Sequence, residues 1–213
     1  MKSIKNKLTW GLMAFLSLGI VIYSLLVYLQ FNPELYAFEA FELHPIGLYS
    51  HIIASSVALL LGPFQFLPRL RQKKYLNLHR WMGRLYLGVG ILIGGLSGLY
   101  MSLFAHGGLI NILGFGTLAI LWLFTGAMAY TTIRRGDTVA HRHWMIRNFA
   151  LTFAAVTLRL WLPLLAVAFQ DFEAGYQAVS WIAWVPNLLI AEWLVRRRSS
   201  ASKKRLRQAP VNL

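Results

Sequence analysis

The chain has 213 residues, of which 57% are hydrophobic and only 13% are charged, and its mean hydropathy is +0.54. One core of this size cannot bury so much apolar surface, which argues against a soluble globular enzyme and excludes a disordered chain or a coiled coil. Cysteine is absent, which excludes a disulfide framework, a thiolate metal site and a thiol nucleophile. The net charge of +14 would suggest nucleic-acid binding in a soluble protein, whereas here the positions of the charges decide.

Six apolar stretches are long enough to cross ~30 Å of hydrocarbon, which takes about 20 residues. They lie at 8–30, 46–67, 85–105, 109–130, 149–170 and 178–195. The first follows three lysines, as in a signal peptide, but its length and the lack of a small-residue cleavage site favour an uncleaved span. The sequence predicts an all-α, polytopic membrane helix bundle over residues 1–195. A basic cytoplasmic tail at 196–213, which we expect to be mobile, follows it.

The basic residues orient the predicted bundle. Of 21 Lys and Arg residues, 3 precede the first span, 6 lie in 69–84, 4 in 134–147 and 7 from 196 onward, and the remaining one is Arg159. The other three loops have none and carry acidic residues instead. This asymmetry predicts that both termini are cytoplasmic in a bacterial inner membrane. It also assigns the positive charge to the bilayer and its anionic inner-leaflet lipids, and not to nucleic acid.

Two short patterns stand out within this plan. Gly90, Gly94 and Gly98 place a flat strip on one face of the third span, which favours close helix packing over the approach of a planar ligand. Trp-Met-x-Arg occurs at 81–84 and again at 144–147, each time where a span leaves the inner face. This repeat fits an interface anchor, with Trp at the headgroups and Arg reaching the phosphates. It also fits a functional element, or a tandem duplication of spans three and four as spans five and six.

Several short motifs lie along the apolar part of the chain: His51, Gly62-Pro63-Phe64-Gln65-Phe66, His79-Arg80, Gly83-Arg84, Tyr86, His141-Arg142, Trp144-Met145-Ile146-Arg147, Arg159, Asn187 and Glu192. In these residues the chain resembles a family of bacterial multi-pass membrane proteins catalogued as a domain of unknown function. The resemblance covers roughly residues 45–195 and implies about six helices without an established chemistry. That family has been compared with dihaem membrane cytochromes and ferric-reductase-like proteins, a comparison that is analogy only.

The inner-face histidines are the best ligand pair, because two imidazoles on facing helices can hold haem iron. His79 and His141 lie at nearly equal depth when the repeat sets the register, within ~1.5 Å. Arg80 and Arg84 would then lie near the haem propionates. His143 is a rival to His141, since the two point about 200° apart on a helix. If this stretch is a loop, the three histidines could instead hold a divalent metal with an aspartate.

The outer side offers weaker ligands. His51 lies ~9 Å inside the second span, His106 lies at the outer mouth of the third, and we expect His44 to be solvated. The fourth span contains no histidine, and His79 and His106 are ~40 Å apart along one helix, more than the hydrocarbon core. The sequence therefore allows one inner haem b but not two stacked haems.

Two ionisable side chains fall inside the spans. Arg159 lies near the midplane, where burial is costly, so it should meet polar partners or a ligand such as a quinone carbonyl. Glu192 is ~12 Å from it in height, which makes Arg147 the better match for Glu192 and Asn187 the best protein partner for Arg159.

Three functions remain open from the sequence. The first is electron transfer linked to a haem or a quinone, with a membrane redox partner. The second is a non-catalytic small subunit or assembly factor of a membrane complex. The third is a small transporter using His51, Arg159 and Glu192. A hydrolase lacks support, because no Ser-His-Asp order and no H-E-x-x-H pattern occurs.

Overall fold

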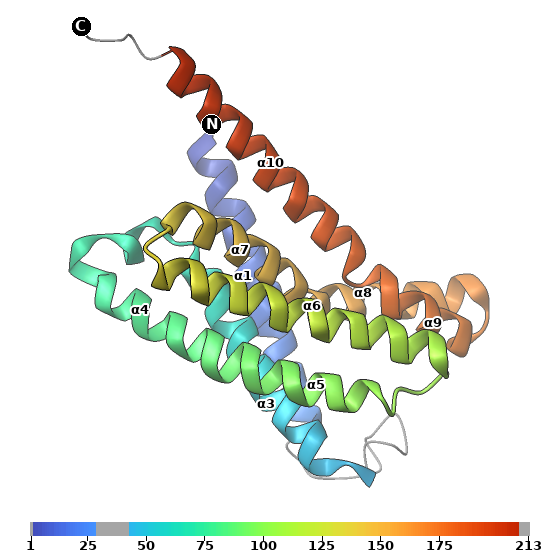
Figure 1. The fold of residues 1–213 in the computed structure, drawn as a ribbon. Helices are drawn as coiled ribbons and strands as arrows, with labels where there is room; N and C mark the ends of the chain where they lie inside the picture. The colour runs from blue at the N-terminus through green and yellow to red at the C-terminus, as the bar shows by residue number, and fades with distance from the viewer. Residues whose placement is uncertain (1, 29–42, 209–213) are drawn as a thin grey trace, which may run out of the picture.

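The computed structural model describes residues 2–28 and 43–208, with side chains from 7 to 28 and from 43 to 197, and this part of the chain is helical without any strand. Six helical segments are long and apolar enough to span a membrane, which confirms the predicted count. The beginning of α1 (Lys2–Tyr28) and the end of α10 (Val185–Gln208) lie on the same side as the beginnings of α4 (Leu76–Leu85) and α7 (Thr138–Thr152) (Figure 1). In chain order the elements are α1 (Lys2–Tyr28), α3 (Pro45–Gln65), η2 (Pro68–Arg71), η3 (Lys73–Tyr75), α4 (Leu76–Leu85), η4 (Tyr86–Ile93), α5 (Gly94–Ser102), α6 (Leu109–Arg134), α7 (Thr138–Thr152), α8 (Ala154–Phe169), α9 (Phe172–Ile182) and α10 (Val185–Gln208).

The basic segments expected as loops are mostly helical, so spans three and five begin about eleven residues earlier than predicted. Gly136, with φ +78°, ends α6, and the Asp137 side chain accepts a hydrogen bond from the Ala140 amide at the start of α7. An N-cap of this kind starts a new helix at once. His141 and His143 therefore lie within a helix. The alternative in which these histidines bind a divalent metal required a loop at this position, and the structure has a helix there instead.

The helix of the last span also continues beyond residue 195, where we predicted it to end, as far as Gln208. Three of the acidic residues in the loops expected on the outer side, Glu34, Glu39 and Glu42, lie outside the described residues.

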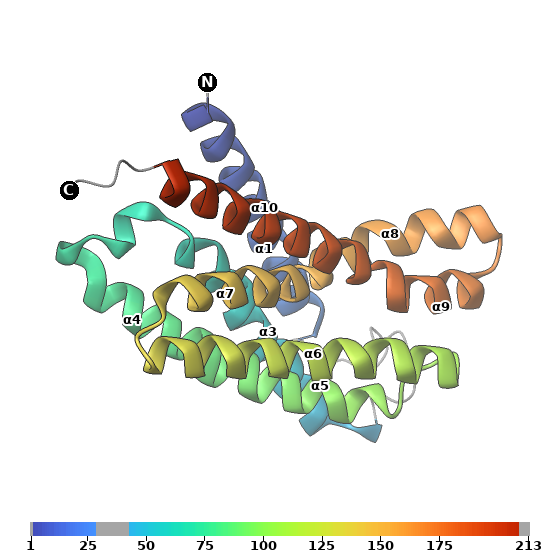
Figure 2. The same cartoon turned by 45° about the horizontal axis from the view of Figure 1, so that its top comes forward.

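Spans five and six are each broken near their middle. Span five changes from α7 to α8 at Phe153, and span six changes from α9 to α10 at Ala183 and Trp184. Pro186 has no backbone N–H, so the second break leaves a carbonyl without its helical donor. The outer halves, α8 and α9, pair with each other (Figure 2), and α9 also packs against α6.

The glycines of span three let α3 pack against it at short range. A Cβ added at Gly90 would lie 3.0 Å from the Ala58 backbone, and one at Gly94 would lie 3.2 Å from the Ser55 nitrogen. A Cβ at Gly98 would lie 2.8 Å from the His51 ring. The strip thus serves helix packing, as predicted. Gly90 lies in the π-helical segment η4, a type of distortion that is often found at functional sites, whereas Gly94 and Gly98 lie in α5.

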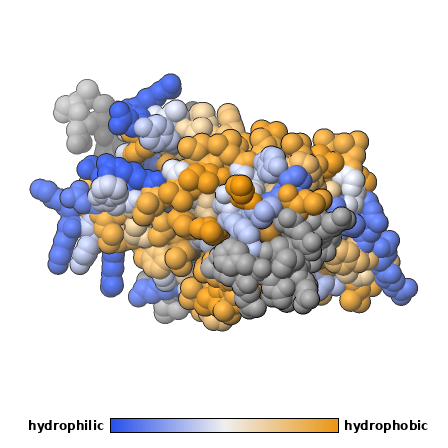
Figure 3. All heavy atoms as spheres, turned by 90° about the horizontal axis from the view of Figure 1, so that it is seen from below, coloured by the Kyte–Doolittle hydropathy of each residue, from blue (hydrophilic) through white to orange (hydrophobic). Residues whose placement is uncertain are grey.

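The interior is a cluster of aromatic and aliphatic side chains between span three, α6, α7 and α10. It includes Tyr86, Trp122, Met145, Phe149 and Trp184, all at most 6% exposed. Large apolar side chains also cover much of the outer surface. The face in Figure 3 shows this apolar surface between hydrophilic groups at two opposite ends, the pattern of a chain surrounded by lipid.

Candidate functional site

The two copies of Trp-Met-x-Arg have the same local geometry. The Arg84 guanidinium lies 4.9 Å from the Trp81 ring centre, and the Arg147 guanidinium lies 4.8 Å from that of Trp144. Cation–π contacts of this kind hold each arginine over its tryptophan. Their surroundings differ, because Trp81 is 61% exposed whereas Trp144 packs edge-on against Phe124. The first copy thus fits an interface anchor.

The second copy takes part in an ion pair. Arg147 donates from Nε and Nη2 to one oxygen of Glu192, at 2.8 and 2.7 Å. Arg196 donates to the other oxygen at 2.8 Å. The predicted match between Arg147 and Glu192 is confirmed. The pairing neutralises an acid that would otherwise be costly at this depth.

The inner histidines come together from two helices. His141 on α7 donates from Nδ1 to the Ala129 carbonyl of α6, at 2.8 Å, which leaves Nε2 as the acceptor nitrogen, and no bond to it is seen among the described residues. His79 on α4 lies close enough to interact electrostatically with His141. Within the described part of the chain, the buried Nδ1 of His79 has no hydrogen-bond partner. A buried polar atom without a partner is rare and calls for an explanation.

A glutamine that our sequence analysis did not single out as a ligand packs against α4 next to Gly83, one turn from His79. Gln65, at the end of α3, is 7% exposed, and its Nε2 also lacks a partner among the described residues. Its Oε1 lies 3.4 Å from the Cβ position of Gly83. Because His79 and Gly83 are four residues apart on one helix, Gln65 packs against the face of α4 that carries His79. The sequence signal that could have identified Gln65 was its position in the Gly-Pro-Phe-Gln-Phe segment, one of the motifs that carry the family resemblance.

The two predicted arginines differ in their relation to these histidines. Arg80 and Arg71 lie within electrostatic range of His79. Arg84 is exposed and lies over Trp81. Arg80 is thus the better placed of the two predicted arginines to meet an anionic group near His79.

A buried polar network lies one to two turns deeper than His79. The Tyr86 hydroxyl donates to Asn148 Oδ1 at 2.6 Å and lies 2.9 Å from Thr152 Oγ1, which also accepts from Trp122 Nε1 at 2.8 Å. Asn148 Nδ2 donates to the Trp122 carbonyl and to Thr125 Oγ1. This network joins η4, α6 and α7. Sequence reasoning missed it, although polar residues four apart within an apolar span were a signal.

Arg159 meets partners other than the predicted one. It donates to the Ala155 carbonyl of its own helix at 2.9 Å and to Ser24 Oγ of α1 at 3.1 Å. Its guanidinium also lies 5.6 Å from the Tyr23 ring centre. The expected bond with Asn187 was wrong, since Arg159 turns towards α1.

Asn187 instead connects the two helix breaks. Its Nδ2 lies 3.0 Å from the Ala183 carbonyl, 3.0 Å from Thr157 Oγ1 and 3.3 Å from the Ala150 carbonyl. Thr157 also donates to Ala183. Backbone carbonyls exposed by a break in a membrane helix must find donors, and this side chain supplies them.

The outer histidines have different surroundings. His51 is partly buried and donates from Nδ1 to the Gly94 carbonyl at 2.9 Å. His44 was expected to be solvated, but its ring stacks on Phe104 at 3.7 Å and bonds to the Tyr100 hydroxyl. His106 is exposed, and its ring lies 6.4 Å from that of Tyr176.

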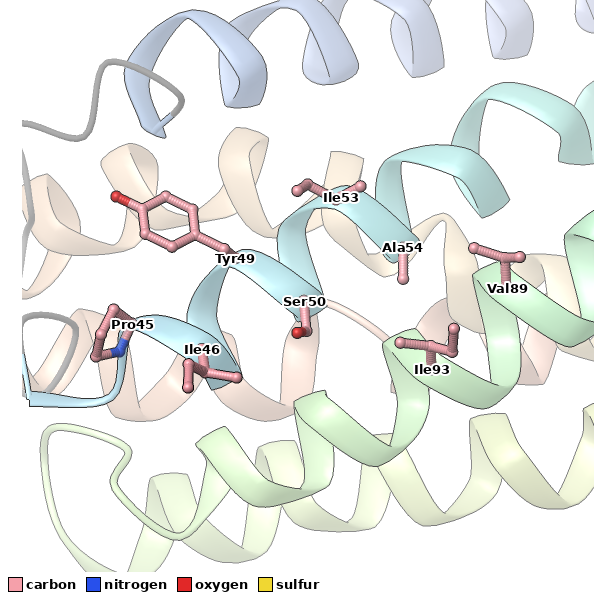
Figure 4. A pocket seen from close by; sticks show the side chains of 8 residues that line it. All are labelled: Pro45, Ile46, Tyr49, Ser50, Ile53, Ala54, Val89 and Ile93. Atoms are coloured by element: carbon pink, nitrogen blue, oxygen red, sulfur yellow. The ribbon is translucent and has the colours of Figure 1, made fainter.

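A shallow apolar groove of about 460 Å³ follows the outer half of α3 beside η4. In Figure 4, the side chains of Tyr49, Ser50 and Ile93 lie along it. It is a lipid-facing surface, separate from the inner histidines.

The comparisons with known proteins agree with this architecture. A family model described as "Predicted membrane protein (DUF2306)" matches residues 48–195. No curated protein and no solved structure matches the chain. The matched segment runs from the beginning of α3 to the apolar part of α10 and contains both inner histidines, Arg159 and Asn187. The chain belongs to this family of predicted membrane proteins of unknown function.

Proposed function

We propose that the protein transfers electrons within a bacterial inner membrane through a haem b held by His79 and His141. The observation that carries this proposal is the hydrogen bonding of the two imidazole rings, in which each ring has a nitrogen available to a ligand. His141 is fixed through Nδ1, and neither its Nε2 nor the buried Nδ1 of His79 has a hydrogen-bond partner in the described residues. A histidine that donates one ring N–H to a carbonyl and offers the other nitrogen is the usual arrangement of a metal ligand.

The surroundings of the two histidines also suit a haem. Arg80 and Arg71 lie near His79 and can meet the propionates. The pair stands at the basic end of the bundle, which positive-inside topology assigns to the cytoplasm. A bound haem would supply one-electron redox chemistry, while the chain holds and orients it and keeps the deeper half of the site dry. A membrane redox partner or a quinol would deliver the electrons.

The test is an absorbance spectrum of the full chain, purified from cells supplied with haem. We expect a Soret band and a reduced-minus-oxidised difference spectrum that His79→Ala and His141→Ala each abolish. His143→Ala is the matched control, since this residue is on the same helix but points about 200° away from His141. It should retain the spectrum, as should His44→Ala.

Two results would contradict the proposal. One is wild-type protein without a Soret band. The other is a spectrum that survives loss of either inner histidine. In both cases the non-catalytic subunit becomes the better hypothesis, because it requires no cofactor.

A further inference from the structure

The two copies of Trp-Met-x-Arg differ in the partner that their arginine has. In the second copy, Arg147 lies over Trp144 and binds Glu192 of the neighbouring helix α10. In the first copy, Arg84 lies over Trp81 at nearly the same distance, but no carboxylate in the described part of the chain lies within ion-pair distance of it. The second copy therefore shows which chemical group this Trp-Arg pair binds from a neighbouring helix.

The chain does not supply such a carboxylate to the first copy. The two tryptophans are 63 residues apart, and the position 63 residues before Glu192 is Ala129, a buried alanine of α6. Asp137 is the other acidic residue among those described at the basic end of the bundle, and it caps α7 by accepting from the Ala140 amide. Glu192 already accepts from two arginines. A second copy of this protein thus offers no carboxylate at this depth that is not already bonded.

The residues around the first copy form an exposed face of span three. Trp81, Leu85 and Leu92 are 61%, 47% and 53% exposed, and Arg84 and Gly88 are exposed as well. Their spacing of three and four residues places them along one side of the span. This face belongs to α4 and η4, and α4 lies at the edge of the bundle (Figure 1).

Gly88 has no packing role within the chain. Nothing lies within 4 Å of the position that its Cβ would take, whereas Gly90 packs against the backbone of Ala58 on α3. A glycine lowers the stability of a helix relative to alanine, and small residues on a membrane helix let the backbone of another helix approach closely. Gly88 thus leaves room for another helix between Leu85 and Leu92.

We propose that this face binds a transmembrane helix of another protein, which carries a glutamate or aspartate at the level of Arg84. The contact repeats the pairing of α10 with α7: the partner's carboxylate accepts from Arg84 above Trp81, and its apolar side chains pack on Leu85 and Leu92. An anionic lipid would also bind Arg84, but it would not require an open glycine one turn deeper in the hydrocarbon.

This inference goes beyond the proposed function, because a partner helix can bind whether or not the inner histidines hold a haem. His79 lies two residues from Trp81 on α4, about 200° around the helix. A partner bound to the exposed face is therefore separated from His79 by the width of one helix, about 10 Å. This placement suits the membrane redox partner that the proposed electron transfer requires.

The experiment measures how a synthetic transmembrane peptide binds the full chain in phosphatidylcholine vesicles, by energy transfer between labels on the two. The probe is a Leu-Ala helix with one Glu near its cytoplasmic end, and a second peptide has Gln there. We expect the Glu peptide to bind about fivefold more tightly, the upper range for a partly exposed ion pair. Arg84→Gln should remove this preference. Arg135→Gln, at an exposed arginine after α6, should retain it.

Two exposed glycines supply a matched pair of variants. Gly88→Leu places a large side chain in the middle of the face and should weaken the binding of both peptides. Gly19→Leu changes an equally open position of α1 and should not. Circular dichroism and gel filtration report whether each variant folds, and the glycine pair decides if Arg84→Gln does not.

The same face can be tested in cells with a photo-crosslinking amino acid at Leu92. We expect a crosslink to a membrane protein that Arg84→Glu abolishes and that a change of the partner's acid to arginine restores. A crosslink that Arg84→Glu leaves unchanged would contradict the proposal.

Other results would also overturn the inference. One is equal affinity of the Glu and Gln peptides for the wild type, and another is equal peptide binding by Gly88→Leu and Gly19→Leu. Energy transfer between two copies of the chain that Gly88→Leu removes would show that a second copy covers the face. Phosphatidylglycerol that stabilises the wild type but not Arg84→Gln, without a preference for the Glu peptide, would identify an anionic lipid instead. A lost haem spectrum with an intact preference would contradict only the proposed function.

Discussion

The hydroxyl of Tyr86 is the point at which the buried network can be tested most cleanly. The side chain is 0% exposed, and Tyr86→Phe removes one oxygen without opening a cavity. Two interactions disappear, with Asn148 and with Thr152. Asn148 Oδ1 then has no other donor in the described residues, whereas Thr152 keeps its bond from Trp122.

The magnitude follows from these bonds. Side-chain hydrogen bonds between membrane helices contribute about 0.6 kcal/mol on average and about 1.7 kcal/mol at most. Two such bonds give an expected loss of about 1 to 3 kcal/mol in the free energy of unfolding. Tyr130→Phe is the control, because this tyrosine is 54% exposed and should change stability by almost nothing.

The assay is unfolding in mixed micelles by increasing sodium dodecyl sulfate, followed by circular dichroism. A double-mutant cycle of Tyr86→Phe with Thr152→Val isolates their interaction, which we expect to be about 0.6 kcal/mol. A coupling indistinguishable from zero, together with equal effects of Tyr86→Phe and Tyr130→Phe, would refute the assignment of this network as a stabilising element.

Three further outcomes follow from the fold. Glu192→Gln should lower stability by about 1 kcal/mol or less and the loss should shrink at high salt, because the pair with Arg147 is partly exposed; a salt-independent loss would contradict this. Gly90→Ala should destabilise by at least about 1 kcal/mol, since its neighbour Ala58 contributes backbone atoms that cannot turn away, whereas Gly88→Ala should be neutral or stabilising; equal melting temperatures would be the opposite result. Reporter fusions in the basic segments and at the C-terminus should read cytoplasmic and fusions in the other loops external, and any reversed fusion would show that the positive-inside assignment fails there.

Counting residues from the ends of a span predicted those features that depend only on distance along a helix. Six spans follow from apolar length, and Arg147 with Glu192 follows from equal distance to the inner face. Neither needs the rotation of a helix about its axis. The glycine strip could be predicted in the same way, because residues spaced by four lie on one face of a helix, and in the structure this face packs against α3.

The rotation of each helix about its axis and the positions of the helix breaks could not be predicted by counting residues. Tyr86, Asn148 and Thr152 meet only because three helices turn the same faces inward, which no count of residues specifies. The breaks at Phe153 and Ala183 carry weak local signals, since only Pro186 marks one of them. Proline does not predict which side chain will bond the carbonyls that a break exposes.

The wrong prediction of a bond between Arg159 and Asn187 shows how helix rotation and helix breaks act together. Arg159 and Asn187 lie at similar depth, as predicted, but depth does not decide between competing acceptors and donors. Asn187 has two amide hydrogens, and the carbonyls exposed by both breaks, together with Thr157, compete for them. A guanidinium is itself only a donor, so it cannot accept the hydrogens of the Asn187 amide. It turns instead to α1, where the Ser24 hydroxyl accepts one of its hydrogens while the Ala155 carbonyl of its own helix accepts another.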